Sequence, residues 1–160
     1  MDIFDFAMQM EKEGEALYRR LADACGDRGL AGILATLADE EAAHQRVIAE
    51  MRHGAPTVAP TTVLRDAANV FRRMKQSGQA FRLDVRQVDM YRKALDIENR
   101  SEAFYREKAE QVAQETQRDV FLRLAAEERK HAVLMDNIVE LVSRPDTWLE
   151  NAEWHHLEEY

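Results

Sequence analysis

Two segments of this chain carry the same charged pattern, and that repeat limits the available folds more than any other feature of the sequence. Residues 37–44 read LADEEAAH and residues 124–131 read LAAEERKH, so each copy ends in Glu-x-x-His. On a helix, side chains three residues apart lie on one face. The glutamate and the histidine of each copy are therefore predicted to point at one place, where a carboxylate oxygen and an imidazole nitrogen suit iron, manganese or zinc.

The similarity of the two copies extends well upstream of these segments. Glu11 precedes Glu41 by the same number of residues as Glu98 precedes Glu128, and no gap is needed to align the copies over this length. Each upstream glutamate lies within a stripe of apolar residues spaced three and four apart, which is typical of a buried helix face. Because internal repeats mark structural units, we predict two similar helical hairpins.

The composition favours an all-α protein. Hydrophobic residues make up 46% of the 160 residues and charged residues 32%, with only six glycines and three prolines. Long amphipathic helices have such a composition, whereas a sheet protein needs more turn residues. A chain of this length is expected to form one domain that buries a continuous core without a disulfide.

Periodicity and helix breakers divide hairpin one (residues 3–53) into two helices, expected at 3–24 and 28–52, with Asp27 as the N-cap of the second. A crossover (residues 54–80) follows. It begins with a linker that contains two of the three prolines and continues with an amphipathic segment at about 63–76. This length is enough to cross a bundle lengthwise, which is needed when neighbouring helices run parallel.

Hairpin two (residues 81–142) is expected to contain a helix that begins between residues 80 and 88 and another that begins near Thr116, where Thr116-x-x-Asp119 is a weak capping pattern. The C-terminal tail (residues 143–160) is rich in aromatic and apolar side chains. We therefore expect it to form a short helix that docks on the bundle or on a second subunit.

If the hairpins pack about a pseudo-two-fold axis, six side chains converge in the middle of the bundle. They are Glu11, Glu41, His44, Glu98, Glu128 and His131. Burial of four carboxylates without counterions would cost many kcal/mol, and two divalent cations would cancel their charge. One Glu from each of two helices with Glu-x-x-His from each of the others is the ligand set of carboxylate-bridged di-iron bundles.

This ligand set, its order and the single long crossover resemble the ferritin-like superfamily. Segments 11–18 (EKEGEALY) and 40–44 (EEAAH) most resemble rubrerythrins, and the similarity covers about residues 4–142. The resemblance implies a ferritin-like four-helix bundle with two iron ions, although manganese or zinc would suit the same site. It also implies that Glu41 and Glu128 bridge the ions, that the two upstream glutamates are terminal ligands, and that each histidine binds one ion.

Two features depart from the rubrerythrin pattern. Many rubrerythrins carry an extra carboxylate one turn after the glutamate of the third helix, where this chain has Ser101, which leaves a six-ligand set more like that of bacterioferritin. Rubrerythrins also typically carry a Cys-rich rubredoxin module, whereas Cys25 is the only cysteine among these residues. The expected reductant is therefore an external electron donor protein.

The function that these features predict is the reduction of hydrogen peroxide or dioxygen at a di-iron centre. The first alternative is a ferroxidase that oxidises ferrous iron at the same centre for storage or transport. The second is a metal-free helical module that acts through association. Tyr18 and Tyr105 lie two turns after the upstream glutamates on the same stripes, so each is expected either to approach a ligand carboxylate or to fill the core.

Other polar residues are expected to lie outside the ligand set. Glu40 and Glu127 recur between the copies but lie about 100° around the helix from the ligands, so a polar helix face is favoured. Glu15 and Glu102 lie near the ligand stripe and are the reserve ligands. Three further histidines and the turn cysteine are expected to be surface residues and a small filler; these are His53, His155, His156 and Cys25.

The net charge and the N-terminal residues limit which partners and which location are expected. The formal charge of −8 and the lack of a basic cluster argue against nucleic acid. The acidic N-terminus lacks the features of a signal peptide, and the longest apolar run is too short for a membrane helix. We therefore expect a cytoplasmic protein without membrane contact, and the apolar tail and long crossover suggest a homodimer.

Overall fold

The computed structural model describes residues 1–77, 87–150 and 157, and these residues form helices joined by turns and one extended linker. The helices are α1 (Ile3–Ala24), α2 (Arg28–Met51), α3 (Val63–Ser77), α4 (Val88–Gln111), α5 (Glu115–Ser143) and α6 (Pro145–Glu150). No strand occurs among the described residues. The predicted all-α fold is confirmed, and the four long helices match the ranges that periodicity predicted to within a few residues.

Side-chain caps mark the starts of the first two helices. Asp2 accepts a hydrogen bond from the backbone of Asp5 at 2.8 Å, and Asp27 accepts one from Leu30 at 2.8 Å, as the sequence predicted for Asp27. The capping prediction for α5 was wrong. Gln114 holds the N-cap position without a side-chain cap, so Thr116 already lies in the first turn.

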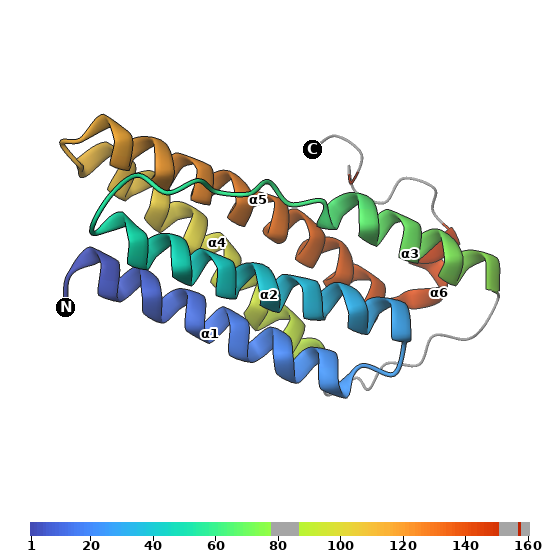
Figure 1. The fold of residues 1–160 in the computed structure, drawn as a ribbon. Coiled ribbons are helices and arrows are strands. Elements are labelled where there is room, and N and C mark those ends of the chain that lie inside the picture. The colour runs from blue at the N-terminus through green and yellow to red at the C-terminus, as the bar shows by residue number, and fades with distance from the viewer. Residues whose placement is uncertain (78–86, 151–156, 158–160) are drawn as a thin grey trace.

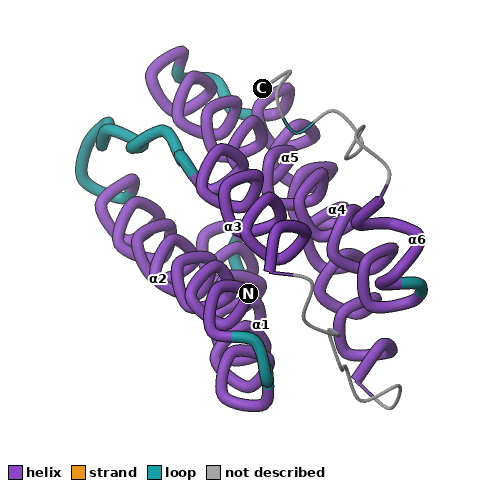
Figure 2. The backbone as a smooth tube through the Cα atoms, turned by 90° about the vertical axis from the view of Figure 1, so that its right-hand side faces the viewer, coloured by secondary structure: helices purple, strands orange, loops and turns teal. Residues whose placement is uncertain are grey.

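The two hairpins α1–α2 and α4–α5 lie side by side, and α2 and α4 run in the same direction (Figure 1). The chain therefore has to return along the length of the bundle between them. It does so as an extended linker, residues 55–62, which lies over the gap between α2 and α5 and leads into α3. Figure 2 shows α3 seated between α2 and α5 at the end of the bundle where α2 begins.

The apolar core is divided into two clusters of buried side chains. One occupies the end of the bundle near α3 and α6 and includes Leu21, Leu34 and Ile138. The other occupies the end near the N-terminus and includes Ile48, Phe121 and Leu124. The middle of the bundle separates them, so polar side chains placed there are sealed from water at both ends.

The beginning of the C-terminal tail docks on the bundle of the same chain. Trp148 is buried and packs edge-on against Phe71 of α3, with ring centroids 4.9 Å apart. Leu149 and Leu157 are buried in the same cluster. Trp154 and Tyr160, together with His155 and His156, lie outside the described residues. No helix in the described part of the chain is long and apolar enough to span a membrane.

Candidate metal centre

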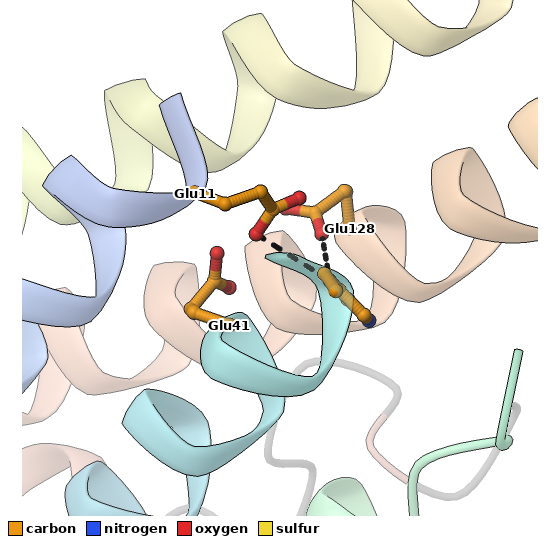
Figure 3. Close-up of side chains that lie close together, drawn as sticks. Glu11, Glu41 and Glu128 are labelled. Carbon is orange, nitrogen blue, oxygen red and sulfur yellow. Dashed lines mark ion pairs between the residues drawn. The ribbon is translucent and has the colours of Figure 1, made fainter. Parts of the chain in front are cut away.

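The structure brings the six predicted side chains together from four helices. They are Glu11 on α1, Glu41 and His44 on α2, Glu98 on α4, and Glu128 and His131 on α5. All six are buried, with His44 the most exposed at 5%. The carboxylates of Glu11, Glu41 and Glu128 point toward one another from three different helices (Figure 3). The predicted convergence in the middle of the bundle is therefore observed.

The six residues form two overlapping groups that would each suit one metal ion. In each group the candidate ligand atoms all lie within 4.8 Å of one another. The first group, which we call the His44 position, consists of Glu11, Glu41, His44 and Glu128; the second, the His131 position, consists of Glu41, Glu98, Glu128 and His131. Glu41 and Glu128 belong to both groups, so they are the side chains placed to bridge two ions.

Each histidine reaches across to the other hairpin. His44 Nδ1 lies 2.7 Å from Glu128 Oε1, and His131 Nδ1 lies 3.0 Å from Glu41 Oε1. The two imidazole rings are stacked with centroids 5.8 Å apart. Both Nδ1 atoms therefore face the carboxylates, and the Nε2 atom of each ring points away from the cluster.

The two tyrosines also cross between hairpins. Tyr18 donates a hydrogen bond to Glu98 at 2.6 Å, and Tyr105 donates one to Glu11 at 2.6 Å. The predicted approach of each hydroxyl to a ligand carboxylate is therefore observed, but the carboxylate belongs to the opposite hairpin. Burial, followed by the charge of the nearest glutamate, raises the pKa of both hydroxyls well above 10.0, so both remain donors.

Burial and mutual repulsion divide the four carboxyl groups into two kinds. Burial, with the charges of neighbouring glutamates, raises the pKa of Glu41 and Glu128 well above 4.5. Burial acts in the same direction on Glu98, but the charge of His131 and several hydrogen bonds outweigh it and lower the pKa to about 2. The pKa of Glu11 is also lowered, because the charge of His44 and the hydrogen bonds from its neighbours, Tyr105 included, together outweigh burial. Without cations, protons thus gather on the two shared glutamates.

A polar support behind His131 was missed by the sequence reasoning. Glu40 Oε1 lies 3.5 Å from His131 Nε2, and the hydroxyl of Thr61 in the crossover linker donates to the same carboxylate. The backbone N–H of Thr61 donates to Glu127 at 3.0 Å. One linker residue therefore joins the two glutamates that recur next to the ligands. The recurrence of these glutamates in both copies is visible in the sequence. The path of the linker, which brings Thr61 to them, is not.

Gly14 provides space for one of the shared glutamates. A Cβ atom added at Gly14 would lie 3.0 Å from Glu41 Oε2, closer than side chains normally approach. The equivalent position in the second hairpin is Ser101, which is buried and donates a hydrogen bond to the sulfur of Met10 at 3.9 Å. The site thus has no carboxylate at this position of α4.

The reserve ligands lie elsewhere. Glu15 pairs with Arg19 and accepts a hydrogen bond from Gln45, whereas Glu102 pairs with Arg106 on its own helix. Neither belongs to a group of candidate ligands within the described residues. These two glutamates are therefore partly buried ion-pair partners of nearby arginines.

The donor set fits two divalent cations. No side chain outside the cluster, among the described residues, donates a hydrogen bond to Oε2 of Glu98 or to either oxygen of Glu128. Buried carboxylate oxygens normally have such partners, and each one without a partner carries a desolvation cost. Shared carboxylates flanked by one terminal carboxylate and one imidazole per ion supply the oxygen and nitrogen donors that iron and manganese accept.

Comparison with known proteins agrees with this geometry. The rubrerythrin family model matches residues 2–138, most of the chain. A hypothetical protein from Pyrococcus furiosus has a similar structure, with a TM-score of 0.65, 20% sequence identity and coverage of 88% of both chains, a likeness that concerns the fold alone. No match was found among curated proteins. With its family match and its buried carboxylate and histidine cluster, the chain belongs to the rubrerythrin family.

Proposed function

We propose that the protein is a di-iron oxidoreductase that reduces hydrogen peroxide or dioxygen with electrons from a separate donor protein. The observation that carries this proposal is the sharing of Glu41 and Glu128 between two ligand groups in a buried interior. Shared carboxylates hold two ions as a pair, and a pair can deliver two electrons to one small oxidant. Reduction of hydrogen peroxide to two water molecules consumes two electrons and two protons.

The protein residues would position the ligands and supply the dry surroundings. Tyr18 and Tyr105 donate to the terminal carboxylates Glu98 and Glu11, so each fixes the orientation of one oxygen. In the metal-free state the raised pKa keeps the shared glutamates protonated. These protons leave when cations bind. The two apolar clusters exclude water from both ends of the site, which strengthens every electrostatic interaction inside it.

Stopped-flow spectroscopy of anaerobic, ferrous-loaded protein tests the proposal. Hydrogen peroxide should oxidise the centre rapidly, and a reduced donor should then support repeated turnover. The variant Glu98→Gln should lose this activity, because it removes a terminal ligand, whereas Glu102→Gln on the same helix should retain it. A protein that accumulates many ferric ions per subunit without consuming peroxide catalytically would refute the proposed reaction.

That contrary outcome would instead support the ferroxidase alternative, which uses the same ligands. One observation favours this alternative as a second candidate: a cavity of about 430 Å³ leads from the surface to His44 and is lined by three glutamates. A cation could be drawn along such a route. The metal-free module is the least supported function, because its core would bury four carboxyl groups with no role in packing.

A further inference from the structure

The crossover breaks the symmetry of the two hairpins around the centre. The extended linker lies over one side of the bundle, between α2 and α5, whereas α5 is followed in the described part of the chain by the short helix α6 (Figure 1). The two predicted metal positions consequently have different surroundings. In both histidines Nδ1 faces the carboxylates. The surroundings therefore differ on the Nε2 side of each ring.

The His131 position is more enclosed than the His44 position, because Glu40 stands between His131 and the cavity that His44 lines. His131 is fully buried at 0% exposure, and its Nε2 atom lies at an ion-pair distance of 3.5 Å from Glu40, without a hydrogen bond between them. Glu40 is in turn held by the hydroxyl of Thr61, so the support extends into the linker. A carboxylate behind a ligating histidine fixes the ring and makes it a stronger ligand.

The His44 position is open on one side. A cavity of about 430 Å³ lies under the linker, and His44 is one of its lining residues. Glu127 is a further buried lining residue of this cavity, while Glu50 and Arg46 line it and are exposed. A second cavity, of about 440 Å³ between α1 and α4, contacts none of the six predicted ligands.

The charges in the first cavity favour a cation over an anion. Glu40, Glu50 and Glu127 line the cavity and Arg46 is the one lysine or arginine among its lining residues. The carboxylate of Glu127 accepts a hydrogen bond from the backbone N–H of Thr61, in addition to its ion pair with Lys130. A cleft lined mainly by one sign of charge raises the local concentration of the opposite ion.

We propose that divalent cations reach and leave the centre through this cavity, so that the ion at the His44 position exchanges faster than the ion at the His131 position. The inference rests on the proposed di-metal centre. It assigns Thr61 and Glu40 as positioning residues for the slowly exchanging ion. The two ions are thus held by equivalent ligand sets but differ in access and in support.

Zinc release measures this difference without any redox activity. Protein loaded with two zinc ions is mixed with an excess of a chromogenic chelator, and the release is followed by absorbance. We expect two phases of equal amplitude. Glu11→Gln removes a ligand unique to the His44 position and should abolish the fast phase, whereas Glu98→Gln should abolish the slow one.

A cavity-filling substitution tests the route. Ala43 lines the cavity next to His44, so Ala43→Leu should slow the fast phase severalfold and leave the slow phase unchanged. The matched control is Ala49→Leu, an exposed residue of the same helix that does not line the cavity. Both changes are compatible with a helix, and a thermal melt confirms that each variant folds.

A second variant tests the support behind His131. Thr61→Val removes the hydroxyl that holds Glu40 and should accelerate the slow phase by roughly tenfold, because loss of a partner behind a ligand weakens metal binding by about that factor or more. Thr36→Val, whose hydroxyl bonds only within its own helix, is the control and should change neither phase.

The outcomes separate this inference from the proposed function. Two zinc ions that leave at one rate, or a fast phase that Ala43→Leu and Ala49→Leu affect equally, would overturn the inference and leave the di-metal centre intact. A folded protein that binds no zinc, manganese or iron would instead refute the centre itself.

Discussion

The sharing of Glu41 between two metal positions makes a quantitative prediction for stability. If each ion is present at 100 times its dissociation constant, it stabilises the folded chain by about 2.7 kcal/mol, so two ions contribute about 5.4 kcal/mol. Glu41→Gln removes a ligand from both ions, whereas Glu11→Gln removes a ligand from one. The two substitutions are chemically identical, so the geometry alone predicts a difference between them.

The magnitude follows from the loss of affinity per ion. If removal of one carboxylate weakens an ion about a hundredfold, that ion then contributes only about 0.4 kcal/mol at the same concentration. Glu41→Gln should therefore retain about 0.8 kcal/mol of the metal-dependent stability and Glu11→Gln about 3.1 kcal/mol. In the metal-free state at neutral pH, Glu41→Gln should instead raise the free energy of unfolding, because the wild-type carboxyl has to take up a proton on folding whereas glutamine does not.

Urea unfolding with excess EDTA and with a fixed concentration of free Mn²⁺ measures these differences. Manganese is preferred because it binds the histidines of an unfolded chain weakly, so that stabilisation reports on the folded site. Glu13→Gln, an exposed residue of α1, is the control and should keep the full stabilisation. Equal losses in Glu11→Gln and Glu41→Gln would refute the shared role of Glu41.

Three further predictions concern single groups in and around the centre. Tyr105→Phe leaves Glu11 without a buried 2.6 Å hydrogen bond and should lower the free energy of unfolding by about 2 kcal/mol, measured by urea denaturation. Gly14→Ala should raise that free energy by up to about 1 kcal/mol through helix propensity, yet weaken Mn²⁺ binding in a calorimetric titration, because the new methyl group displaces Glu41. The third prediction concerns pH, because the folded-state pKa of Glu41 and Glu128 is raised above 4.5. Their contribution to stability is present below about pH 4.5 and is lost as the pH rises through the folded pKa, by roughly 1.4 kcal/mol per pH unit for each group. Unfolding free energies in EDTA that increase from about pH 5 to pH 8 would contradict this.

The repeat was enough to predict the helices and the convergence of six side chains, because both depend on local periodicity. A glutamate on a buried stripe of each helix has to meet its counterparts wherever the hairpins pack. The division of labour between Glu41 and Glu11 followed from the family resemblance rather than from spacing, and metal binding by all six residues remains a prediction. The sequence predicted that each tyrosine hydroxyl could approach a ligand carboxylate, but not that the carboxylate would belong to the other hairpin. The contact between Tyr18 and Glu98 depends on how the hairpins dock.

The contacts of the crossover could not be predicted from the sequence. The linker has no periodicity, so nothing in it indicates that Thr61 lies beside Glu40 and Glu127. The position of those two glutamates around the helix favoured a solvated or a helix–helix polar face, whereas the linker contacts both of them and Glu127 is only 5% exposed. A helix start was misplaced for a similar reason: backbone geometry at Gln114 begins α5 without help from any side chain.

Protons and cations compete for the same two carboxylates, and this competition connects stability, metal affinity and pH. Without cations, the raised pKa of Glu41 and Glu128 keeps protons where the shared ligands would carry charge, while Glu98 remains charged opposite His131. A cation can bind between the shared carboxylates only when those protons leave, so affinity should rise with pH over the same range in which the metal-free chain loses stability. Each proton released gives up to about a tenfold gain in affinity per pH unit. The metal-free chain loses stability at neutral pH because its buried carboxyl groups lack counterions. Two divalent ions would supply those counterions, so the same unfavourable free energy favours metal binding.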